Sequence, residues 1–249
     1  MEHINRRTML SATAAAAAST IFISDQAKAE CPSEAKQCPN QKGTQMADGY
    51  KIVDGVKVYD NSYFYDADGK FLAGRAKDAY MEMFDRFGYP YPKGFRDNAE
   101  FWVLEGGVGD FARVGMGGII WINRNEPGFS YFGHDIYLLP FQMIPEHSHH
   151  PTKFPAKMES WHVRYGSIYN FAEVGEDNRP FPVPVPESQQ PFTHLKHYEE
   201  LHVGDISHLA KLESWHCMMG GPQGTIVTEY ANYHDGDGLR FANPKVSFC

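Results

Sequence analysis

Short runs of aromatic and β-branched residues, separated by glycine and proline, recur along the chain from residue 101 onward. Runs of this length with turn residues at both ends are typical of strands, so the pattern predicts a mostly β protein. The proline-rich segment 179–191 interrupts the runs, and we expect it to form a long surface loop. The expected strands span residues 101–104, 114–122, 137–144, 159–171, 197–202, 214–219 and 225–233.

One segment ahead of these runs has helical periodicity instead. Between residues 78 and 87, Tyr80, Phe84 and Phe87 fall on one face of a helix, and Gly88 follows as a stop signal. We expect this aromatic face to pack in the core.

The first 29 residues read as a targeting signal. Asn5-Arg6-Arg7-Thr8-Met9-Leu10 is a twin-arginine motif, an alanine-rich apolar stretch follows, and Ala27-Lys28-Ala29 is a cleavage signal. The apolar stretch is too short and too weakly hydrophobic for a stable membrane anchor. We therefore expect a periplasmic protein that is exported in the folded state. The predicted parts are a signal peptide (1–29), an N-terminal extension with one amphipathic helix (30–100) and a β domain (101–249).

Composition narrows the classes of function. The 249 residues are 42% hydrophobic and 14% aromatic, which is enough to build a substantial core. The formal net charge is −8, and lysine and arginine form no basic stripe, so nucleic acid is not an expected partner.

Three histidines and a glutamate form a candidate metal-binding set. In the stretch His147-Ser-His149, an extended strand would place both imidazoles on one face. Glu159 could reach the same ion from the next strand, and His216 could supply a third imidazole. A single His-x-His among 12 histidines is unremarkable, but three imidazoles and one carboxylate suit a divalent ion that keeps positions open for a substrate.

The same residues resemble the two motifs of the cupin family. Glu159 begins an E-x6-G stretch that ends at Gly166 and completes a pattern of the form H-x-H…E-x6-G. Gly204-Asp205 followed by His216 resembles the second motif, although its usual Pro-x-Gly turn is missing. The resemblance implies an all-β, cupin-type double-stranded β-helix (jelly roll) barrel over residues 101–249, with the helical and irregular extension ahead of it.

A short sequence repeat leaves two alternatives for the metal ligands. Residues 157–162 and 211–216 both read Lys-x-Glu-Ser-Trp-His. Glu159 and His162 are three residues apart and face opposite ways on a regular strand, so only one of them can join the ion. We choose Glu159 from the first copy and His216 from the second, which leaves His162 and Glu213 outside the metal site.

The four cysteines allow three pairings in an oxidising compartment. The pairing of Cys31 with Cys38 is favoured because it closes a short loop. Cys217 directly follows His216, so on a strand its sulfur would face away from the ion, and we expect a packing role or a disulfide for it.

From about residue 83 to residue 248, the chain resembles the D-lyxose isomerase family of cupin sugar isomerases. The resemblance implies metal ligands at His147, His149, Glu159 and His216, a small sugar as substrate, and a homodimer. The leader, the segment before residue 72 and part of the run after residue 235 depart from the family pattern. The matching segments are Gly107–Gly115, Ile122–Asn125, Gln142–Pro145 leading into His147, Lys157–Glu159, Glu229–Asp235 and Leu239–Phe241.

Isomerase chemistry assigns roles to three further residues. An aldose becomes a ketose when hydrogen moves between C1 and C2, and negative charge builds on the sugar oxygens, which a divalent ion stabilises. Glu229 is the expected base, Lys157 would stabilise or protonate an oxygen, and Arg240 would orient the carboxylate or the sugar hydroxyls. Manganese is the expected ion, with cobalt, zinc or iron as alternatives, and D-lyxose or D-mannose the expected substrate. An iron-dependent cupin oxygenase or a non-catalytic sugar- or metal-binding cupin would use the same ligands.

Overall fold

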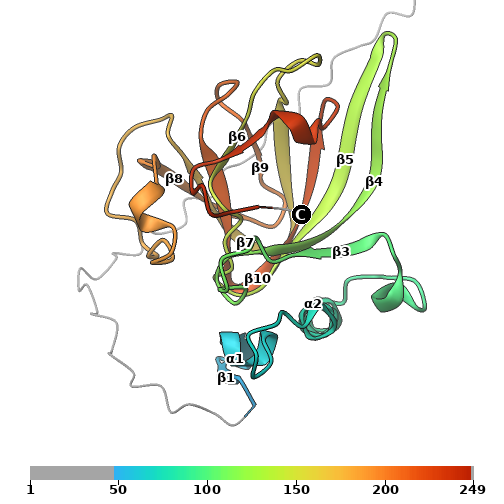
Figure 1. The fold of residues 1–249 in the computed structure, drawn as a ribbon, viewed down its shortest axis with the longest axis vertical. Helices are drawn as coiled ribbons and strands as arrows, with labels where there is room; N and C mark the ends of the chain where they lie inside the picture. The colour runs from blue at the N-terminus through green and yellow to red at the C-terminus, as the bar shows by residue number, and fades with distance from the viewer. Residues whose placement is uncertain (1–47, 248–249) are drawn as a thin grey trace, which may run out of the picture. The chain divides into compact units, whose positions relative to one another are not determined.

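Nine antiparallel strands form one curled sheet in the computed structural model, which describes residues 48–247 (Figure 1). The strand order is β11-β6-β10-β5-β4-β3, and β7 pairs with β10, β8 and β9. The predicted signal peptide, Cys31, Cys38 and Cys249 lie outside the described residues. The strands are β3 (Phe101–Leu104), β4 (Met116–Glu126), β5 (Phe129–Leu138), β6 (His147–His149), β7 (Glu159–Ala172), β8 (His197–His202), β9 (Ile206–His208), β10 (His216–Ala231) and β11 (Leu239–Phe241).

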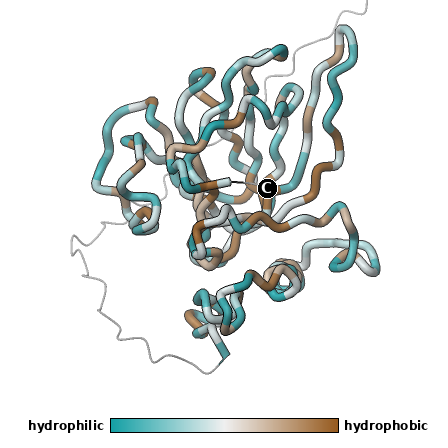
Figure 2. The backbone as a smooth tube through the Cα atoms, in the orientation of Figure 1, coloured by the Kyte–Doolittle hydropathy of each residue, from teal (hydrophilic) through white to brown (hydrophobic). Residues whose placement is uncertain are grey.

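The long strand β10 is central to the curled sheet because it pairs along both edges. Its residues 225–231 pair with β5 on one side and with β7 on the other, and His216 at its start pairs with His147 of β6. Residues from distant parts of the sequence therefore face one interior. Figure 2 shows hydrophilic residues along the loops and at the tip of the β4–β5 hairpin. The expected all-β, cupin-type barrel is confirmed.

A small hairpin and helices precede the barrel. They comprise β1 (Tyr50–Val53), β2 (Val56–Tyr59), the short helix α1 (Asn61–Phe64), the helix α2 (Ala73–Phe87) and the 3-10 turn η1 (Phe95–Asp97). Two further 3-10 turns, η2 (Gln190–Phe192) and η3 (Gly236–Gly238), lie among the later loops. No helix in residues 48–247 is long and apolar enough to cross a bilayer.

The helix α2 packs its aromatic face against the barrel. Tyr80 and Phe84 are fully buried with Phe101 of β3 and Tyr137 of β5 in one apolar cluster. Burial of each such side chain contributes about 1.5–3 kcal/mol. Gly88 ends the helix in the left-handed conformation at φ 65°, as its position predicts. The helix begins five residues earlier than predicted, at Ala73.

Four of the expected strands differ from the structure by more than one residue, and the first of them, 114–122, is β4 at Met116–Glu126. The expected strand 137–144 is wrong in its bounds, because β5 covers Phe129–Leu138 and the chain then turns. The turn is held by the buried Gln142 side chain, which accepts a hydrogen bond from Leu139 N at 3.1 Å and donates one to Phe111 O at 2.6 Å. The two expected strands 214–219 and 225–233 are one strand, β10, with a shift in register between Gly220 and Thr225.

Candidate metal and catalytic site

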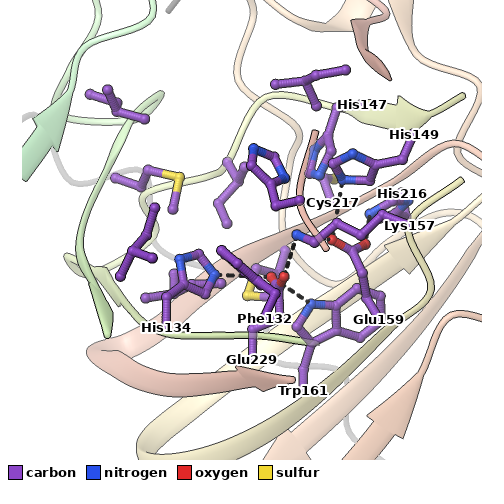
Figure 3. Close-up of a pocket in the computed structure, with 18 of the residues that line it drawn as sticks. Phe132, His134, His147, His149, Lys157, Glu159, Trp161, His216, Cys217 and Glu229 are labelled. Atoms are coloured by element: carbon purple, nitrogen blue, oxygen red, sulfur yellow. Dashed lines mark hydrogen bonds and ion pairs between the residues drawn. The ribbon is translucent and has the colours of Figure 1, made fainter. Parts of the chain in front are cut away.

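Four side chains meet inside the barrel, and we call them the ligand group. Each contributes one nitrogen or carboxylate oxygen, and these four atoms all lie within 4.8 Å of one another (Figure 3). Strand alternation explains the meeting, because β6 places its two imidazoles on the inner face while Ser148 between them points elsewhere and contacts His150 Nε2 at 3.1 Å. The ligand group consists of His147 and His149 from β6, Glu159 from the start of β7 and His216 from the start of β10.

Backbone carbonyls fix the orientation of two of the imidazoles. His147 Nδ1 lies 2.9 Å from Pro145 O, and His216 Nδ1 lies 2.9 Å from Ser214 O. A carbonyl can only accept, so each Nδ1 carries the proton and donates it. When these rings are neutral, their Nε2 atoms keep a free lone pair, which is the form that binds a metal ion.

Three buried polar atoms of the ligand group lack hydrogen-bond partners. His149 Nε2, His216 Nε2 and Glu159 Oε2 are buried without a properly oriented hydrogen bond. His216 Nε2 nevertheless lies 2.8 Å from Glu159 Oε2, and His149 Nε2 lies 3.1 Å from Glu159 Oε1. Buried polar groups are normally paired, so atoms that face a common centre without hydrogen-bond geometry fit a divalent cation bound between them.

The protonation states suit the same interpretation. Burial, followed by the neighbouring His216 and His149, holds the pKa of His147 well below its ordinary value, so this ring is neutral. Burial opposes the charge of Glu159, but Lys157 and the histidines outweigh it and hold the pKa of this carboxyl well below its ordinary value. Burial likewise opposes the protonation of His216, yet Glu159 raises the pKa of that ring, so a bound cation would displace a proton there.

Lys157 links the ligand group to a second buried carboxylate. Its Nζ lies 2.7 Å from Glu159 Oε1 and donates a hydrogen bond to Glu229 Oε1. Its ammonium also lies 4.4 Å from the centre of the Phe132 ring. Although burial lowers the pKa of Lys157, the two carboxylates outweigh burial and raise it, so the side chain is a cation.

Glu229 accepts hydrogen bonds from three sides. Besides Lys157, His134 Nε2 lies 3.1 Å from Glu229 Oε2, and Trp161 Nε1 donates to the same oxygen at 3.3 Å. Burial and Glu159 raise the pKa of Glu229, but Lys157 and His134 lower it more, to about 2. The side chain is therefore a carboxylate at neutral pH.

The structure does not bring Arg240 to this group. Arg240 pairs with Ser148 and is exposed, and its Nη1 donates to the carbonyls of Asp237 at 2.7 Å and Leu239 at 2.8 Å. Its neighbours Leu239 and Phe241 line the interior instead. Strand alternation is the reason, since a residue between two inward side chains points outward.

His162 and Glu213 lie outside the ligand group, in agreement with the choice of Glu159 and His216. His162 is on the opposite face of β7 from Glu159, opposite Ile206 of β9. Glu213 is an exposed turn residue whose Oε2 lies 3.2 Å from His150 Nδ1. Cys217 is buried in an apolar cluster with Met143 and Phe171, as expected for a packing role.

A cavity of about 310 Å³ connects the ligand group with Lys157 and Glu229. Its wall includes Trp161, which also borders a second cavity of about 440 Å³ between β7, β8 and β9. The lining also includes aromatic and histidine side chains that were not predicted from the sequence, namely Trp102, Phe132, His134, Trp161 and His234.

Sheet register explains two of the missed residues. Glu229 of β10 is directly opposite His134 of β5 on one edge and Trp161 of β7 on the other. Correct bounds for β5 would have placed His134 beside Glu229 because paired residues on one face contact each other.

Comparisons with known proteins point to sugar isomerases. The chain is 28% identical over 172 residues to a D-lyxose ketol-isomerase of Cohnella laeviribosi, covering 69% of this chain and 90% of that protein. It is 24% identical over 148 residues to a D-lyxose ketol-isomerase of Thermofilum sp. (strain ex4484_79), covering 58% of this chain and 77% of that protein. No family model matches.

Solved structures show the same fold. The L-ribose isomerase of Cellulomonas parahominis with L-ribose has a TM-score of 0.51 at 15% identity, over 70% of this chain and 94% of that one. The L-ribose isomerase of Acinetobacter sp. DL28 with L-ribose has a TM-score of 0.50 at 15% identity, over 70% and 94%. The fold is thus that of the cupin-type sugar isomerases. In sequence, the chain is similar to the D-lyxose ketol-isomerases within that group.

Proposed function

We propose that the protein is a divalent-metal-dependent aldose–ketose isomerase that acts on a small aldose such as D-lyxose or D-mannose. The observation that supports this most is the contact between Lys157 and both Glu159 and Glu229, because it places a buried cation and a second carboxylate beside the ligand group. A plain metal-binding protein or an iron oxygenase has no need of that pair. The similarity to D-lyxose ketol-isomerases supports the same activity.

Glu229 is the proposed base. The carboxylate would accept the proton from C2 of the aldose and return it to C1, while the hydroxyl proton of O2 passes to O1. His134 and Trp161 both contact Oε2, so they hold the carboxylate in one orientation, while Oε1 faces Lys157. Its low pKa makes it a weak base at rest. A substrate oxygen that draws Lys157 away would remove the largest cause of that low pKa and make Glu229 more basic.

Lys157 is the proposed partner of the sugar oxygens. Its ammonium can donate to the oxygen on which negative charge develops, while Glu159 keeps it in place. A divalent cation at the ligand group would supply Lewis-acid stabilisation of the same charge. Manganese is our proposed ion. The twin-arginine motif within residues 1–29 supports export to the periplasm, and the family resemblance supports a homodimer.

Turnover with and without metal tests the proposal. With Mn²⁺ or Co²⁺, the protein should interconvert D-lyxose or D-mannose with the ketose, and a chelator should abolish the reaction. Lys157→Ala and Glu229→Gln should keep their metal but lose rate by on the order of 10²-fold or more. Lys211→Ala, an exposed lysine of the echoed segment, is the matched control and should keep full rate.

Other results would contradict the proposal. If the fully metallated protein converts no aldose, the binding-protein function is favoured instead. Oxygen uptake with Fe²⁺ would favour an oxygenase. Equal rates in the wild type, Lys157→Ala and Glu229→Gln would remove both residues from the mechanism.

A further inference from the structure

The cavity has two chemically different ends. The ligand group, Lys157 and Glu229 form one end. The other end consists of five apolar side chains that pack into one cluster, and we call them the apolar floor. None of them carries a group that makes a strong hydrogen bond to a hydroxyl. The apolar floor consists of Leu104, Met116, Ile136, Ile144 and Met218.

A row of rings joins the two ends along one wall. Ring centres are 5.7 Å apart between His149 and His234, 5.4 Å between His234 and Phe132, and 4.8 Å between Phe132 and His134. Trp102 stacks next at 6.1 Å from His134 and packs against the apolar floor. In Figure 3, His134 lies well away from His149, on the opposite side of the cavity.

Three buried polar atoms on this wall have no partner, namely His234 Nδ1, His134 Nδ1 and Trp102 Nε1. All three residues line the cavity. Buried polar atoms are normally paired, so these side chains make the wall the polar part of the cavity beyond the ligand group, Lys157 and Glu229. A hydroxyl beside this wall would have polar side chains near it, whereas a hydroxyl on the apolar floor would lose its water without replacement.

We infer that the preferred substrate is a 6-deoxyaldose, a sugar that ends in a methyl group where an ordinary hexose has a hydroxymethyl group. With C1 and C2 at the ligand group, the methyl end would rest on the apolar floor. A methyl group gains from apolar burial, while an unpartnered hydroxyl is disfavoured there. The cavity volume of about 310 Å³ is within the range for small ligands. The inference rests on the proposed function because it orients the sugar by its reacting carbons.

Two sugars that differ only at C6 test the inference. D-mannose and 6-deoxy-D-mannose have the same configuration at every chiral centre, so a difference in kcat/KM reports on the C6 group alone. We expect the deoxy sugar to be favoured by on the order of 10-fold or more. Equal values, or a preference for D-mannose, would overturn the inference while leaving isomerase activity intact.

Binding of unreactive alditols separates this inference from the proposed function. Calorimetry should show tighter binding of 6-deoxy-D-mannitol than of D-mannitol, by a similar factor, even if the metallated protein converts neither sugar. In that case the isomerase proposal fails and the inference about the apolar floor stands. No binding, or no difference between the alditols, would overturn the inference.

A matched pair of variants locates the effect. Met218 lies on the apolar floor, whereas Met219, next to it on β10, packs in a different cluster on the other face of the strand. Met218→Gln places an amide against the C6 group and should reduce the preference for the deoxy sugar by on the order of 10-fold. Met219→Gln should leave the preference unchanged.

The readout tolerates partial misfolding. The ratio of kcat/KM for two sugars does not depend on the fraction of protein that is folded. If Met218→Gln gives no soluble protein, Met116→Gln of β4 makes the same test from another strand. An unchanged ratio in the floor variant that folds would overturn the inference.

Discussion

Replacing Lys157 with methionine should expose the electrostatic strain that this lysine relieves. Glu159 is 1% exposed and Glu229 is 4% exposed, and Lys157 is the cation that contacts both of them. Methionine keeps most of the length of the side chain and its packing. The change therefore leaves two buried carboxylates facing each other without the ammonium between them.

The expected loss is about 3–5 kcal/mol in the free energy of unfolding, because removal of one partner leaves a buried charge uncompensated. The pKa of Glu229 gives a similar figure. It is about 2 against an ordinary value of 4.5. At about 1.4 kcal/mol for each pKa unit, that difference corresponds to about 3 kcal/mol.

The pH dependence of the free energy of unfolding follows from the direction in which the pKa of Glu229 is shifted. In the wild type, the lowered pKa of Glu229 contributes stability above pH 4.5, and this stability is lost as the pH falls towards 2. In the variant, burial and Glu159 remain while Lys157 is gone, so we expect the pKa of Glu229 to rise above 4.5. Its charge then destabilises the fold at high pH. The difference between wild type and variant should be larger at pH 8 than at pH 5.

Urea unfolding at both pH values, with a chelator present, measures the effect without a contribution from bound metal. Lys211→Met is the control, because Lys211 occupies the same place in the echoed segment and is exposed. It should change the free energy of unfolding by less than about 0.5 kcal/mol. Equal losses in the two variants, or a loss for Lys157→Met that is the same at both pH values, would refute the reasoning.

Two further predictions concern the ligand group and the wall. Alanine in place of any one member of the ligand group should abolish metal binding, whereas His162→Ala and Glu213→Ala should retain it. Metal analysis of the purified variants measures this. Loss of metal in His162→Ala or Glu213→Ala, with retention in the ligand-group variants, would mean that the wrong strand face was chosen. Trp161→Phe keeps the ring between the two cavities but removes the donor to Glu229 Oε2, so kcat should fall by on the order of 10-fold with metal content unchanged. Trp215→Phe, which alters a tryptophan stacked on His194, should not change kcat.

Much of the fold was predictable because strand signals are local. The bounds of β3 and β8 match the expected strands, and β7 differs by a single residue. The turn after β5 could not be predicted from local signals. Residues 139–144 are hydrophobic enough for a strand, but the buried Gln142 bonds to Phe111 and to Tyr80 Oη at 2.6 Å, which are distant in sequence.

The residues of the candidate site also differ in how far they could be predicted from local sequence signals. Strand alternation paired His147 with His149, the cupin mixture of three histidines and one carboxylate selected Glu159 and His216, and the structure brings all four together. His134 could not, because it became visible only once β5 was paired with β10. Arg240 was chosen through the family resemblance without a strand assignment. Its place on β11, between two inward-facing residues, turns it away from the cavity.

The two Lys-x-Glu-Ser-Trp-His segments, 157–162 and 211–216, share a sequence pattern but adopt different structures. In the first copy, β7 begins at Glu159, and extended backbone before it places Lys157 and Glu159 on the same face. In the second copy, Glu213 adopts φ 63° in a turn, so β10 begins only at His216 and Lys211 stays exposed. Each copy therefore contributes a different residue type to the ligand group.

The buried position of Lys157, between Glu159 and Glu229, suits it to the proposed reaction. When Glu229 accepts a proton from the substrate, the total charge in the cavity does not change, but the negative charge moves from the carboxylate to a sugar oxygen. Lys157 contacts Glu229 at the start and is held by Glu159 throughout, so it can follow that charge over a short distance without leaving the site. A cation that is already positioned and desolvated needs little reorganisation, which is how buried charges lower a barrier. In the proposed reaction, the Lys-x-Glu spacing would couple the metal ligand to the proton transfer.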